Sequence, residues 1–213
     1  MRNVLQYLMM TCAATCTLTA PALALDTSAC FQPATTLTSV TDDLAKDGWE
    51  TTTDRSDLVI EHLTWTGMPQ YFAGDSGGQS LANVLDMKRM SARGILRKKD
   101  LPNAQTRILT RQTDTQIELA KVVWVAVSPT QTTIHCTFSV GASSVDNWAT
   151  HVPNPDAMPL FLRIPHSNVS LDQTQASQDI VALNRASLSQ DLGVPVPSDA
   201  IIETYLSFLA KEN

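Results

Sequence analysis

In the N-terminal half of the chain, apolar side chains recur at every third or fourth position, as they do on one face of a helix. Over 37–44 this spacing follows threonines that can cap a helix, and Gly48 stands where a helix commonly ends. We therefore expect a helix of about three turns there. Over 57–65 the apolar residues fall on every side, and a helix is favoured because Ser56 or Asp57 can cap it.

The most regular helical pattern begins at Ser80, after a glycine-rich stretch over 67–78. Arginines follow one another at a spacing of four along one flank of this segment, and Gly94 weakens it. The pattern predicts an amphipathic helix of about five turns. Its apolar stripe consists of Leu81, Val84, Leu85, Ala92, Ile95 and Leu96.

After residue 105 the apolar period changes from 3.6 to 2. The ranges 106–111, 117–127 and 133–140 have the length and the turn residues of three consecutive strands. The middle range is apolar on both faces, as in a central strand that is covered on both sides. The third alternates cleanly and has Cys136 on its inward face. These three ranges predict an antiparallel meander.

The C-terminal part contains shorter patterns. Strands are expected over 160–164 and 180–184, and a helical turn over 187–192. For 199–210 a buried terminal helix is favoured, although alternate residues in this range also fit a strand. Because the helices precede the meander, we expect a single α+β domain over 25–213, in which helices pack on an antiparallel sheet.

Residues 1–24 have the features of a cleavable signal peptide. Arg2 supplies a positive start, 4–18 is mostly apolar, and the small residues Ala22 and Ala24 flank Leu23 before a cleavage site after Ala24. The alternative is an uncleaved membrane anchor, but the apolar stretch is shorter than the roughly 20 residues that a span needs. We therefore expect a periplasmic or secreted protein that has no transmembrane span after cleavage.

Cysteine use agrees with export. Cys12 and Cys16 leave with the signal peptide, so the mature chain keeps Cys30 and Cys136. Two isolated cysteines in an exported protein most simply form one disulfide bond. A redox-active pair would need a CxxC spacing or a histidine beside the cysteine, and His135 points to the opposite face of its strand.

Charge is distributed unevenly along the chain. The net charge of −6 becomes −7 when Arg2 is removed with the signal peptide, which argues against a nucleic-acid binder. The range 88–111, however, holds eight basic residues and one acid between two acidic ranges. The eight are Lys88, Arg89, Arg93, Arg97, Lys98, Lys99, Arg107 and Arg111.

Two interpretations of this basic segment stay open. Its cations could pair internally with the acidic flanks, as surface charges commonly do. They could instead dock an anionic surface, namely phospholipid headgroups, lipopolysaccharide or an acidic protein. Met87 and Met90 fall on the side away from the apolar stripe, which suits an adaptable contact.

The candidate chemistry is sparse. The range 74–78, Gly-Asp-Ser-Gly-Gly, resembles the loop that holds the nucleophile of trypsin-like serine proteases, but the upstream histidine and aspartate motifs of that family are missing. A turn that leads into a helix is sufficient to explain this glycine-rich range. Binding of an anion at the start of that helix is a further hypothesis. The four histidines, His62, His135, His151 and His166, have no metal-ligand spacing, and no cofactor motif is present.

The sequence thus predicts an exported, non-enzymatic binding or envelope-accessory module that docks through a basic helix at about 80–99. The alternative is a periplasmic hydrolase that uses Ser76. The sequence leaves the oligomeric state open.

Overall fold

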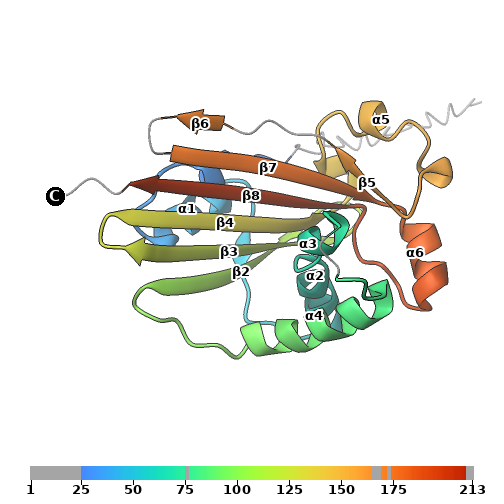
Figure 1. Cartoon of the computed structure of the whole chain (residues 1–213), viewed down its shortest axis with the longest axis horizontal. Helices are drawn as coiled ribbons and strands as arrows, with labels where there is room; N and C mark the ends of the chain where they lie inside the picture. The colour runs from blue at the N-terminus through green and yellow to red at the C-terminus, as the bar shows by residue number, and fades with distance from the viewer. Residues whose placement is uncertain (1–24, 75–76, 165–168, 172–173, 210–213) are drawn as a thin grey trace, which may run out of the picture.

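An antiparallel sheet of eight strands forms the centre of the part that the computed structural model describes, residues 25–74, 77–164, 169–171 and 174–209. The strand order is β1-β2-β3-β4-β8-β7-β5, and β6 pairs with β7 (Figure 1). The strands are β1 (Glu50–Thr51), β2 (Ala104–Gln112), β3 (Ile117–Ser128), β4 (Gln131–Val140), β5 (Phe161–Ile164), β6 (Val169–Leu171), β7 (Thr174–Leu183) and β8 (Ala200–Leu209). Together with the helices this sheet makes an α+β fold, as the sequence predicts.

The predicted meander is confirmed. β2, β3 and β4 pair consecutively, each one or two residues longer at some end than the pattern indicated. β3 is covered on both sides, because Leu119 and Val122, which point to opposite faces, are both fully buried. The apolar pattern thus identified both the strands and their place in the sheet.

The helix favoured for 199–210 is wrong, because this range forms β8. Its alternate residues Ile202, Leu206 and Phe208 lie in the core, while Ile201 packs on the opposite face. β4 offers β8 an unbroken ladder from Gln131↔Leu209 to Val140↔Ala200. This ladder and burial on both faces favour a strand over a helix. β7 likewise extends well beyond the predicted range 180–184.

The longer helices begin at the predicted capping residues. The side chains of Thr36, Ser56 and Ser80 accept hydrogen bonds from backbone N–H groups in the first turns of α1, α2 and α4. The helix favoured over 57–65 is therefore confirmed. The helices are α1 (Leu37–Ala45), α2 (Asp57–Trp65), α3 (Pro69–Phe72), α4 (Leu81–Ile95), α5 (Trp148–His151) and α6 (Arg185–Leu192), with 3-10 turns η1 (Ser28–Phe31), η2 (Ala142–Ser144) and η3 (Pro155–Ala157).

The helices cover the two faces of the sheet differently. η1 and α1 pack on one face, where Trp49 and Phe138 contact each other in the core. α2, α3, α4 and α6 pack against one end of the other face, over Leu119, Val181 and Ile201 (Figure 1). In the described residues, none of the helices is both long and apolar enough to span a bilayer.

The predicted disulfide bond is confirmed and joins Cys30 of η1 to Cys136 of β4. Both cysteines are fully buried in the core between α1 and the sheet. The bond closes a chain segment with a sequence separation of 106 residues. It therefore fastens the N-terminal segment to a central strand.

Replacement of both cysteines by alanine tests the contribution of this bond. In the chain-entropy model, closing a loop of this length reduces the entropy of the unfolded chain and so raises the free energy of unfolding by up to about 4.7 kcal/mol. We expect the Cys30→Ala, Cys136→Ala variant to lose about that free energy of unfolding in urea titrations. Equal stability of variant and wild type, or two free thiols in the exported protein by mass spectrometry, would contradict the expectation.

Candidate functional site

Four of the eight basic residues predicted to dock a partner lie exposed at the C-terminal end of α4 and just beyond it. They are Arg93, Arg97, Lys98 and Lys99. None of them forms an ion pair with another described residue. The partial negative charge at a helix C-terminus favours cations at this position. Their charges are free to act on the surroundings.

Two basic residues on the inner flank of α4 are held by the protein itself. The guanidinium of Arg89 donates to both carboxylate oxygens of Glu61, at 2.6 and 3.0 Å, and to Asp86 at 2.8 Å. Lys88 is half-buried, and its aliphatic chain passes close to Gly67. A Cβ atom built on this glycine would lie only 3.1 Å from Cδ of Lys88. These residues attach α4 to the neighbouring α2 segment.

The two basic residues of β2 are also paired. Arg107 donates to Asp100 at 2.5 Å near the surface. Arg111 is buried and donates twice to one oxygen of the fully buried Glu118, at 2.7 and 3.1 Å, while its guanidinium lies 4.8 Å from the Trp49 ring. The predicted basic segment is thus divided into four exposed cations, three arginines that are paired with acids, and the half-buried Lys88.

Large apolar side chains are exposed beside the free cations. Met87, Met90 and Leu101 have relative exposures of 44%, 66% and 51%. The spacing of three between Met87, Met90 and Arg93 puts them on one face of α4. We name this region the α4 outer surface, which consists of Met87, Met90, Arg93, Arg97, Lys98, Lys99 and Leu101.

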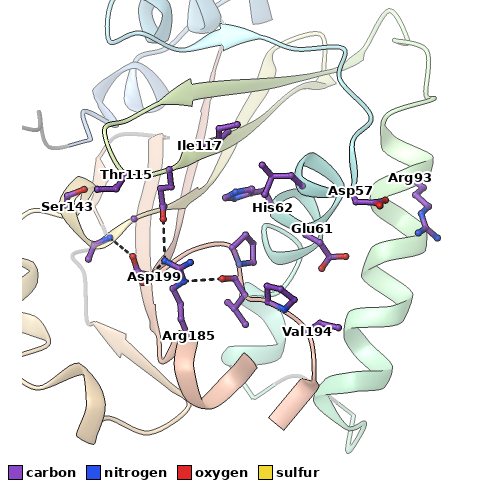
Figure 2. Close-up of a pocket in the computed structure, with 17 residues that line it drawn as sticks. Asp57, Glu61, His62, Arg93, Thr115, Ile117, Ser143, Arg185, Val194 and Asp199 are labelled. Carbon is purple, nitrogen blue, oxygen red and sulfur yellow. Dashed lines mark hydrogen bonds and ion pairs between the residues drawn. The ribbon is translucent and has the colours of Figure 1, made fainter. Parts of the chain in front are cut away.

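A cavity of about 1070 Å³ lies between α2, the turn before β3, and the segment that joins α6 to β8 (Figure 2). Its walls combine polar side chains with an apolar strip. The polar lining residues are Asp57, Glu61, His62, Arg93, Thr115, Gln116, Ser143, Arg185 and Asp199, and the apolar ones are Leu58, Ile117, Val194, Pro195, Val196 and Pro197. This size and mixed lining are typical of a small-molecule site.

His62 of α2 is the most deeply buried polar side chain of the cavity wall. Only 2% of it is exposed, and its Nδ1 lies 2.8 Å from the Oγ of the fully buried Ser139 on β4. Burial, and secondly the positive charge of Arg185, lower the pKa of His62 to about 4. The imidazole is therefore neutral at neutral pH.

Arg185, at the start of α6, donates to acceptors on two segments, the one that joins α6 to β8 and the turn before β3. Its Nε donates to the Val196 carbonyl at 3.0 Å, and its Nη1 to Asp199 and Gln116, both at 3.4 Å. Asp199 also accepts a 3.0 Å hydrogen bond from the backbone N–H of Ala142. Figure 2 shows this group at one end of the cavity, with the ring of His62 turned toward it.

Sequence reasoning did not identify this cavity. His62 and Arg185 are more than a hundred residues apart in the sequence. Neither of them, nor Asp199, belongs to a short motif. The only local signal is that His62 stands in a helix that is apolar on every side, which indicates a buried histidine. Arg93 is the one predicted docking residue that also lines the cavity.

None of the remaining candidates that the structure describes adds a site. Ser76 and His166, like the predicted signal peptide over 1–24, lie outside the described residues, so the hydrolase alternative stays a prediction. His135 lies 2.6 Å from Glu203 on the sheet surface. Among the described residues, no group of three or more histidine, cysteine or acidic side chains could hold a metal ion.

Comparison with known proteins gives no match to a family model, a curated protein or a solved structure. The functional inference therefore rests on the geometry of the α4 outer surface and of the cavity.

A pair of arginine variants separates structural from free cations. We expect Arg111→Gln to lower the free energy of unfolding by about 3–5 kcal/mol, because Glu118 would remain buried without its partner. Arg93→Gln, at an exposed position, should change it by no more than about 0.5 kcal/mol. Urea unfolding of both variants measures the difference, and similar values would show that the buried pair has no special role.

The low pKa of His62 predicts a pH dependence of stability. The unfolded chain binds a proton on this histidine near pH 6.5 and the folded chain only near pH 4, so protonation favours unfolding. The free energy of unfolding has its full value above about pH 6.5 and decreases as the pH falls toward about 4. At about pH 5 the decrease that His62 causes is about 2 kcal/mol. Urea unfolding across this range should show a smaller decrease in His62→Gln than in wild type and His151→Gln. An equal decrease in all three would refute the assignment.

Proposed function

We propose that this protein is an exported, non-enzymatic binding module that docks on an anionic lipid surface through the α4 outer surface. The observation that supports this proposal most directly is the group of four exposed cations without ion-pair partners in the described residues, next to exposed methionines. This arrangement lies on a protein with an acidic net charge. Like charges kept together raise the local positive potential, which attracts an anionic surface.

The chemistry of the surface fits phospholipid headgroups. Each Lys or Arg near an anionic membrane contributes about 1 kcal/mol of attraction, which salt weakens. Met87, Met90 and Leu101 are flexible or extended apolar side chains that can enter the boundary between headgroups and acyl chains. The helix would lie on the membrane surface with its opposite face still packed on α2 and the sheet.

The proposed compartment is the periplasm. The signal-peptide pattern over 1–24 supports export, and the Cys30–Cys136 bond is compatible with an oxidising compartment. The single arginine before the apolar stretch favours a Gram-negative periplasm. In that compartment the inward-facing leaflets of both membranes present anionic phospholipid headgroups.

Vesicle co-sedimentation tests the proposal with the mature protein. We expect binding to vesicles of phosphatidylglycerol and phosphatidylcholine at low salt, weaker binding at physiological salt, and no binding to pure phosphatidylcholine. The Arg93→Glu, Arg97→Glu variant should bind at least about tenfold more weakly. Lys46→Glu, Arg163→Glu is the matched control, because it makes the same charge change at exposed positions elsewhere.

Salt-insensitive binding, or equal losses in the two variants, would overturn the proposal. Absence of binding to anionic vesicles would also overturn it, and binding to purified lipopolysaccharide or to an acidic protein would then identify one of the other predicted partners.

A further inference from the structure

The inner end of the cavity presents hydrogen-bond donors that no described acceptor satisfies. The Nε2 of Gln116 is buried without a partner, and it lies against Gly141, where a Cβ atom would be only 2.8 Å away. The Nη2 of Arg185 also has no hydrogen-bond partner among the described residues, although Nε and Nη1 do. Only the Gln116 nitrogen is buried, because the Arg185 side chain is 43% exposed and lines the cavity. Nη2 of Arg185 therefore has capacity for an acceptor on a molecule in the cavity.

His62 supplies a third donor at the same end. The hydroxyl of Ser139 is fully buried, and its one hydrogen-bond partner in the described residues is Nδ1 of His62. The hydroxyl therefore donates to Nδ1, because otherwise its proton would be buried without an acceptor. In the neutral ring the remaining proton is then on Nε2, which makes this atom a donor as well.

The opposite wall of the cavity is apolar and partly open. Leu58 and Val194 are exposed by 46% and 39%, and Ile117 and Val196 continue the apolar strip between them and the inner end. Exposed apolar side chains that surround a cavity indicate an apolar ligand part. The ligand thus has an apolar chain attached to an acceptor group.

The charges around the cavity limit the acceptor group to a single negative charge. Asp199 lies 3.4 Å from Arg185 and already balances part of its charge. Asp57 and Glu61 lie on the α2 side, and Glu61 is itself paired with Arg89. A dianion such as a phosphate monoester would meet repulsion from these acids, whereas a monoanion with two oxygens needs only Nη2 of Arg185 for one oxygen and Nε2 of His62 for the other.

We infer that the cavity is a binding site for an organic monocarboxylate with an apolar chain. Its carboxylate accepts hydrogen bonds from Arg185 and His62, and its chain lies along Leu58, Ile117 and Val194. This site is separate from lipid docking, since the cavity shares only Arg93 with the α4 outer surface.

Calorimetric titration with octanoate, 1-octanol and butyrate tests the inference on the mature protein without vesicles. We expect octanoate to bind, and 1-octanol and butyrate to bind at least about tenfold more weakly, since one lacks the charge and the other most of the chain. Arg185→Gln should weaken octanoate binding about tenfold and leave 1-octanol binding unchanged. Arg163→Gln is the matched control at an exposed arginine outside the cavity. Arg97→Glu should retain octanoate binding.

A second variant keeps the test decisive if Arg185→Gln does not fold, which thermal melting of each variant shows. Val194→Glu places a negative charge on the exposed apolar wall and should weaken octanoate binding by a similar factor without disturbing the core. The inference is overturned if octanoate does not bind, if 1-octanol binds equally well, or if the cavity variants bind octanoate as the control does.

Discussion

The pairing of β8 with β4 along an unbroken antiparallel ladder holds the two parts of the sheet together. The meander of β2, β3 and β4 lies on one side of this pair, and β7 with β5 and β6 lies on the other. Both faces of β8 contribute to cores, because Ile202 and Leu206 pack toward α1 and Ile201 packs toward α2 to α4. Without this ladder the C-terminal strands would have no strand edge on which to pair, and neither helical layer would pack on a complete sheet.

The same ladder determines the position of the cavity. The residue just before β8, Asp199, donates its backbone N–H to Val140 at the end of β4, and its carboxylate accepts from Ala142 in the turn that follows. Asp199 in turn accepts a hydrogen bond from Arg185, which lies opposite His62. Nδ1 of His62 is hydrogen-bonded to Ser139 of β4. The polar end of the cavity is thus assembled around the last turn of the β4–β8 pair, and the apolar wall is the segment that leads into β8. The α4 outer surface lies outside this assembly, since α4 contacts α2 on its other side.

Local pattern was sufficient for the elements whose two faces differ. The capping residues Thr36, Ser56 and Ser80 and the alternation around Cys136 predicted helices and strands that the structure contains, and the disulfide followed from the count of cysteines. The C-terminal segment was predicted as a helix because Ile201, Ile202 and Leu206 fit both periods. Because the apolar residues of β8 fit a helix as well as a strand, its pairing with β4 decides between the two structures.

The sequence by itself determined the fold class, the meander, the disulfide pair and the presence of a segment rich in cations, because each depends on residues that are close in the chain or on their kind and number. Only the tertiary structure decided which cations are free. Arg89, Arg107 and Arg111 form ion pairs with acids of the fold, and Arg93 and Arg97 form none with the described residues. It also brought His62, Arg185 and Asp199 to one cavity. The physical reason is that pairing and enclosure depend on distances between side chains that only the packing of β8, α2 and α6 creates.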